Sequence, residues 1–161
     1  MGGFPTPLCS TGGTPARKWL DLSKVSAQRR KVKYYFLSNE NQIAKEIVDV
    51  AYKIHTTLGS GLLESVYQTV LVYELEKRGL NFVRQQPIPV VYKRVRLEEG
   101  FRADIIVENK VIIEIKSPEA VAPVHKKQLL TYLRLTNLRL GLLINFNALI
   151  RDGITRIANG L

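Results

Sequence analysis

Three charged side chains interrupt two short apolar segments of this 161-residue sequence. Asp104 lies within "FRADIIV", and Glu114 and Lys116 lie within "VIIEIK". Because side chains alternate across a β-strand, Glu114 and Lys116 share one face of the second segment, and the intervening Ile113 and Ile115 share the other. Apolar side chains would pack at lower cost at the charged positions, so the charges point to chemistry.

A hairpin brings the two carboxylates together. If residues 108–110 form a three-residue loop, Val107 pairs with Val111, and Asp104 lies opposite Glu114 at a Cβ separation of about 5 Å. Two facing carboxylates destabilise a sheet, and in a semi-buried setting one of them is protonated unless a cation lies between them. Oxygen ligands suit Mg²⁺ or Mn²⁺, so the pair predicts a divalent metal site.

Lys116 extends the predicted site along the same face. It lies about 6.6 Å beyond Glu114, within reach of a water or a phosphate held by the ion. There its ammonium can orient or help to deprotonate an attacking water and offset charge that builds on phosphorus. The alternative is a solvent-facing side of an antiparallel sheet, where these groups only pair with one another and with water. The apolar run "LGLLINF" (140–146) predicts a central, covered sheet and favours the functional interpretation.

Two helices precede the first strand. Apolar residues recur at helical spacing from Ile43 to Leu58, with Ser38 or Asn39 available as the N-cap. After the break "LGSG" (58–61), residues 62–79 predict a second helix that ends at Gly79. Its expected apolar side consists of Leu63, Tyr67, Leu71 and Leu75.

The rest of the chain predicts a sheet with one crossover helix. Residues 82–93 are β-prone, but Pro87 and Pro89 indicate an edge or bent strand. The charged hairpin follows, then a helix over 123–138 whose apolar positions include Leu129, Leu130, Leu133 and Tyr132. A buried strand over 140–146 and an edge strand at "GITRI" (153–157) complete the pattern. The order ααβββαβ predicts an α/β fold with a mixed central β-sheet flanked by helices.

Composition limits the class of protein. The formal charge of +10 suggests a polyanionic partner such as nucleic acid. Cys9 is the only cysteine in the sequence, which excludes an internal disulfide and a cysteine-based zinc cage. There is no apolar run of about 18 residues and no secretory signal pattern, so we expect a soluble, cytoplasmic protein with no membrane partner.

The charge also predicts the domain organisation. Residues 1–40 hold seven Lys or Arg against two acids, and their first half is rich in Gly, Pro, Ser and Thr. We expect them to form a disordered basic N-terminal extension, followed by one folded domain over 41–161. The segment "QRRKVKYYF" (28–36) is either a solvated tail or a surface that follows a phosphate backbone and stacks on bases.

The sequence resembles a known pattern at these residues. Asp104, nine residues, Glu114, one residue and Lys116 resemble the D-x(n)-E-x-K signature of the PD-(D/E)XK nuclease superfamily. "GLLESVY" (61–67) matches the Gly-x-x-Glu-x-x-Tyr element of the GxxExxY family, a branch of that superfamily. Residues 128–146 also resemble this family's helix and last core strand. The similarity covers about residues 41–160.

The resemblance implies a restriction-endonuclease-like core and a set of site residues. The catalytic set that it implies is Glu64, Asp104, Glu114, Lys116 and Gln128. The metal set that it implies is Glu64, Asp104, Glu114 and the carbonyl of Ile115, around Mg²⁺ or Mn²⁺. Without the family, Glu64 is explained by the positive end of a helix dipole, worth about 0.3–1 kcal/mol, and Gln128 by a helix surface. His55 is expected to be a packed or surface residue outside the catalytic set.

The function expected from these residues is metal-dependent hydrolysis of phosphodiester bonds in nucleic acid. The alternative is a catalytically inactive nuclease-fold module that binds nucleic acid or a protein partner; a third interpretation is a scaffold without a ligand. The choice of DNA or RNA, the cutting position and the specificity stay open. The oligomeric state stays open too, a homodimer being compatible with the sequence.

Overall fold

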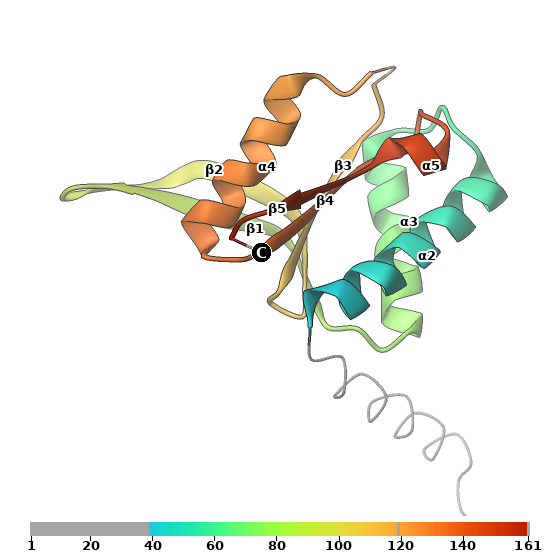
Figure 1. Ribbon diagram of the computed structural model, residues 1–161, viewed down its shortest axis with the longest axis horizontal. Helices are drawn as coiled ribbons and strands as arrows, with labels where there is room; N and C mark the ends of the chain where they lie inside the picture. Colours follow the sequence, from blue (N-terminus) through green and yellow to red (C-terminus); the bar gives the residue numbers. More distant parts are fainter. Residues whose placement is uncertain (1–38, 119, 161) are drawn as a thin grey trace, which may run out of the picture.

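The structure is a computed structural model and describes residues 39–118 and 120–160. In this part of the chain, five strands form one mixed sheet with helices against both of its faces (Figure 1). The predicted extension and its basic aromatic segment at 28–36 lie outside the described residues, except for its last two positions. The elements in chain order are α2 (Glu40–Leu58), α3 (Glu64–Lys77), β1 (Phe82–Tyr92), β2 (Val95–Val107), β3 (Val111–Lys116), α4 (Pro123–Thr136), β4 (Leu140–Asn145), α5 (Ile150–Gly153) and β5 (Ile154–Ala158).

The strands lie in the order β1-β2-β3-β4-β5, which is also their order along the chain. β3 and β4 are parallel because α4 connects them as a crossover, and the other neighbours are antiparallel. β1, which contains Pro87 and Pro89, is an edge strand as predicted, and β5 is the other edge. The predicted α/β fold with a mixed sheet and flanking helices is confirmed.

α2 and α3 cover one face of the sheet. α2 begins after Asn39, whose Oδ1 accepts a hydrogen bond from the backbone N–H of Gln42 at 2.9 Å. The apolar side of α2 and the buried side of α3 form one cluster with alternate residues of β2, β3 and β4. No helix in the described part of the chain is long and apolar enough to cross a membrane.

The start of α3 differs from the prediction. Leu63 is the N-cap residue in extended conformation and is 72% exposed, so its inclusion in the apolar side of the helix is wrong. Tyr67, Leu71 and Leu75 are fully buried as expected. The helical spacing was extrapolated one turn too far, because the chain before Glu64 is extended and so directs Leu63 away from the core.

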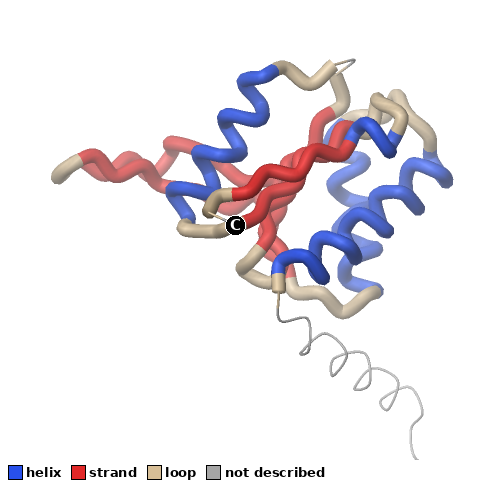
Figure 2. Tube along the Cα trace, in the orientation of Figure 1, coloured by secondary structure: helices blue, strands red, loops and turns tan. Residues whose placement is uncertain are grey.

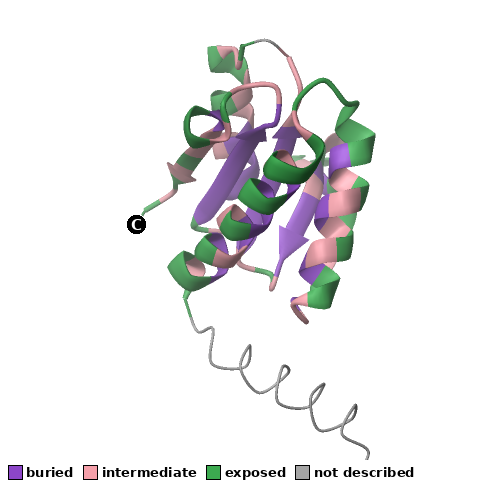
Figure 3. Cartoon of the chain, turned by 90° about the vertical axis from the view of Figure 1, so that its right-hand side faces the viewer, coloured by how far each residue is buried: buried purple, intermediate pink, exposed green. Residues whose placement is uncertain are grey.

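α4 covers the opposite face and so buries the central strands on both sides (Figure 3). Leu129, Tyr132 and Leu133 pack in a cluster with Ile112 of β3 and Leu143 of β4. All six residues of β4 are buried, which confirms the prediction for the apolar run.

The hairpin between β2 and β3 has the predicted register near its turn, with Val107 paired to Val111. The ladder stops at the pair Ile105 and Ile113, so Asp104 and Glu114 are not a ladder pair. β2 then continues with β1 as a two-stranded ribbon that projects from the rest of the protein (Figure 2).

The strand also changes face at Asp104. Ala103 packs in the cluster on the α4 side together with Ile106, so the prediction that it shares a face with Ile105 is wrong. The β1–β2 pairing skips Asp104 and its neighbour Gln85, whose φ of 49° is in the left-handed region. Strict alternation fails because the ribbon bends where it separates from β3.

Candidate active site

Glu114 is a buried carboxylate near the end of β3, with 4% of its surface exposed. Its Oε1 accepts a hydrogen bond from the Lys116 ammonium at 2.9 Å. Its Oε2 is buried and has no hydrogen-bond partner in the part of the chain that the structure describes. Burial and the nearby charge of Asp104 raise the pKa of Glu114 to about 7, against the opposing effect of Lys116. The position thus strongly disfavours the ionised carboxylate.

Lys116 balances this acidic surrounding. Its partial burial opposes the charged form and is the largest single effect, but the hydrogen bond to Glu114 and the charges of Glu114, Asp104 and Glu64 together raise the pKa of Lys116. The ammonium therefore stays protonated at neutral pH.

Asp104 takes the place of the missing ladder contact. Its Oδ2 accepts a hydrogen bond from the backbone N–H of Ile115 at 2.8 Å, and its Oδ1 accepts one from the Gln85 amide at 3.3 Å. Gln68 of α3 donates to the Asp104 carbonyl at 3.0 Å. The carboxylate is thus fixed against β3, close enough to Glu114 to raise its pKa.

Glu64 lies in the first turn of α3 and approaches the end of β3. Its Oε1 accepts a hydrogen bond from the backbone N–H of Ser117 at 2.9 Å. Tyr67 fixes the loop that leads to it: its hydroxyl donates to the Gly59 carbonyl at 2.9 Å and accepts from the Leu62 N–H at 3.2 Å. The Tyr67 ring stacks on Phe146 with centroids 4.3 Å apart.

Two asparagines at the end of β4 complete the support, and sequence reasoning missed them. Asn147 accepts a hydrogen bond from the Gly61 N–H and donates to the Ser117 carbonyl, both at 2.9 Å. Asn145, which is 2% exposed, donates to the Pro118 carbonyl at 3.1 Å and accepts from the Asn147 N–H at 3.0 Å. A polar amide directly after the apolar run was the available signal, because a buried amide is costly unless it is hydrogen-bonded.

Gln128 is joined to the site through Tyr132, to whose hydroxyl its amide donates a hydrogen bond. Tyr132 is 2% exposed, and burial followed by the charge of Glu114 raises the pKa of its hydroxyl. His55 packs with a ring nitrogen 3.1 Å from the Ala148 carbonyl oxygen, consistent with a structural residue.

The structure does not gather all three predicted acids into one metal cluster. Among residues 39–118 and 120–160, no group of three or more His, Cys, Asp or Glu side chains is arranged to hold a metal ion. The reason is that Glu64 is bonded to the Ser117 N–H, beyond the end of β3. Asp104 and Glu114 remain as a close pair, and two carboxylates suffice for Mg²⁺, which keeps several waters. The unpartnered, buried Oε2 of Glu114 fits such a cation.

The comparisons with known proteins agree with this geometry. The family model of the PD-(D/E)XK nuclease superfamily matches residues 41–157, and the chain belongs to this superfamily. Its fold is therefore a restriction-endonuclease-like fold, and nucleases of this superfamily generally depend on divalent metal ions. No curated protein matches the chain. The crystal structure of SSO0001 is similar over 87% of this chain and 79% of its own, with 18% identity and a TM-score of 0.45.

Proposed function

We propose that the protein is a metal-dependent nuclease of the GxxExxY family that hydrolyses phosphodiester bonds in nucleic acid. The observation that carries the proposal is the buried Oε2 of Glu114, which lies unpartnered among the described residues beside a second carboxylate and a lysine. The three residues of the family element also support it. Gly61 and Tyr67 hold the loop before Glu64, and Glu64 binds the end of β3.

Asp104 and Glu114, with the carbonyl of Ile115, are the residues that would hold Mg²⁺ or Mn²⁺. A bound divalent ion supplies an activated water and polarises a phosphate oxygen. Lys116 contributes charge: because its pKa is raised, it stabilises the negative charge that develops on the phosphate and does not accept a proton from water.

Two further residues position this group. Glu64 fixes the backbone at Ser117, directly after Lys116, and its negative charge acts on the ammonium. Gln128 orients the Tyr132 hydroxyl, which lies within the electrostatic reach of Glu114. In this arrangement Glu64 acts mainly through the position of the β3 end, because the described residues form no three-acid cluster.

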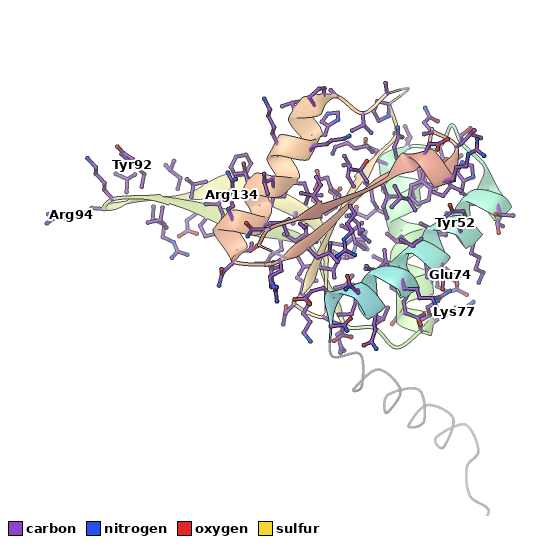
Figure 4. All side chains as sticks on the ribbon, in the orientation of Figure 1. Tyr52, Glu74, Lys77, Tyr92, Arg94 and Arg134 are labelled. Carbon is purple, nitrogen blue, oxygen red and sulfur yellow. The ribbon has the colours of Figure 1, made fainter. Side chains whose placement is uncertain are left out.

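A cleavage panel tests the proposal. Labelled single-stranded DNA, duplex DNA and RNA are incubated with wild-type protein in Mg²⁺ or Mn²⁺, and with Glu114→Gln and Lys116→Ala. Loss of one such electrostatic group lowers the rate by about 10²–10³-fold. The matched controls are Glu76→Gln and Lys77→Ala, which alter the same residue types on α3; Lys77 lies at the end of the protein away from the ribbon (Figure 4).

Each outcome has a clear meaning. Cleavage by the wild type and both controls, with loss in the two site variants, supports the nuclease. Metal-independent binding of nucleic acid without cleavage of any substrate identifies the inactive binding module instead. Equal cleavage by Glu114→Gln and wild type contradicts the assignment of the site.

A further inference from the structure

The part of the β1–β2 ribbon from Pro89 to Gly100, here called the arm, extends past the end of β3 at which the candidate site lies. β2 is paired with β3 only from Ile105 to Val107, so the arm has no strand beside it on that edge among the described elements. Nine residues separate Asp104 from Val95 at the turn, a length of about 30 Å at ~3.3 Å per residue. Figure 1 shows the arm projecting from the body of the protein.

The surface of the arm is unusual for an isolated ribbon. Four large apolar side chains are more than half exposed there: Val91, Tyr92, Val95 and Leu97. A two-stranded ribbon is marginally stable by itself in water, and an exposed apolar patch commonly marks an interaction site. The arm therefore presents a surface suited to a partner.

The charges of the arm indicate the chemistry of that partner. Residues 91–97 contain three cations and no acid: Lys93, Arg94 and Arg96. Tyr92 and Arg94 lie at the far end, away from the rest of the protein (Figure 4), and the Lys93 ammonium lies 5.5 Å from the Tyr92 ring centroid. Cations beside an exposed aromatic ring suit phosphates and the sugar or base surface next to them.

The base of the arm is in contact with the candidate site. The Phe101 ring packs on Tyr132 with centroids 5.2 Å apart, and the Tyr132 hydroxyl bonds to Gln128. A hollow lined by Pro87, Glu98, Phe101 and Arg102 lies beside this contact. A polymer bound along the arm would thus continue directly toward Glu114.

We propose that the arm binds duplex DNA along a groove and holds the duplex on one side of the cleaved phosphate. A two-stranded β-ribbon fits the major groove, and about 30 Å corresponds to about nine base pairs at ~3.4 Å per pair. The choice of DNA as the partner rests on the proposed nuclease function. A second copy of the chain is disfavoured as occupant, because paired arms would bring two sets of three cations together.

Binding measured without metal tests the arm separately from catalysis. Fluorescence anisotropy of a 30-base-pair duplex in EDTA is followed against salt for the wild type and for Lys93→Ala/Arg94→Ala/Arg96→Ala. Each lost phosphate contact lowers the slope of log affinity against log salt by about 0.9, so we expect a decrease of about 2.7 and about 100-fold weaker binding at 0.1 M salt. The charge-matched control, Lys45→Ala/Lys53→Ala/Lys77→Ala on α2 and α3, should change the slope less.

A short duplex provides the second measurement. An eight-base-pair duplex cannot span from the site to the end of the arm, so the arm variant should bind it with nearly wild-type affinity. Circular dichroism and the melting temperature should be unchanged, because the altered side chains are exposed.

The failures of the two proposals are distinguishable. Equal slopes for the arm and control variants overturn the arm proposal, even where the wild type cleaves DNA. A wild-type dimer that the arm variant converts to a monomer in sedimentation also overturns it. Loss of duplex binding in the arm variant, together with no cleavage by the wild type in any metal, supports the arm and rejects the nuclease.

Discussion

The buried carboxylate of Glu114 predicts a stability that depends on pH. Its pKa rises from 4.5 to about 7 on folding, which corresponds to about 3 kcal/mol at ~1.4 kcal/mol per pH unit. The folded protein binds the extra proton between these two values. The contribution of this group is therefore fully present below pH 4.5 and is lost as the pH rises through about 7.

Glu114→Gln copies the protonated form, so we expect it to match the wild type near pH 4.5 and to exceed it by about 3 kcal/mol at pH 8. Urea unfolding at both pH values measures the difference. Lys116 does not disturb the comparison, because its raised pKa keeps it charged throughout this range. The control is Glu76→Gln on the exposed side of α3, with an expected effect below about 0.5 kcal/mol.

Added Mg²⁺ separates a metal site from a simple scaffold. At ten times its dissociation constant, an ion that binds only the folded state stabilises it by about 1.4 kcal/mol. We expect this increase in the wild type and its loss in Glu114→Gln. A variant that is no more stable than the wild type at pH 8 would refute the account of Glu114 as a strained, buried carboxylate. An equal Mg²⁺ effect in both proteins would refute its role in metal binding.

Three further predictions concern the support of the site, and thermal or urea unfolding measures each of them. Asn147→Ala leaves the Gly61 N–H and the Ser117 carbonyl without this partner and should cost about 1–3 kcal/mol; no loss would contradict its bridging role. Tyr67→Phe keeps the stack on Phe146 but removes two hydrogen bonds, so we expect a loss of about 1–3 kcal/mol together with weaker cleavage. Leu63→Ala should change stability by less than about 0.5 kcal/mol, whereas Leu71→Ala in the core should cost about 2–5 kcal/mol; similar losses would contradict the observed start of α3.

Local periodicity was sufficient to predict the element order and the hairpin turn. The pairing of Val107 with Val111 follows from a three-residue loop, and the continuous apolar run at 140–146 is buried on both faces. Such features depend on neighbours in sequence, which the pattern of residue types reports directly.

The failures occur where distant contacts decide the conformation. Leu63 was assigned to a helical face, but the loop held by Tyr67 and Asn147 sets the start of the helix. Ala103 was assigned by alternation, yet the ribbon bends at Asp104, whose side chain binds the Ile115 N–H in place of a ladder pair. The proposed site residues could be named from their types and spacing, whereas the position of Glu64 beside Ser117 required the tertiary structure.

The bridge made by Asn147 has a consequence for biosynthesis. It joins residues 86 positions apart on one side and 30 on the other, so it cannot exist before the last strand of the parallel pair has been made. Contacts of such long sequence separation form late in folding. A ribosome-bound chain that ends before this asparagine thus lacks the tie between the acidic helix and the lysine-bearing strand, and we expect it to leave the messenger on which it is being translated uncut.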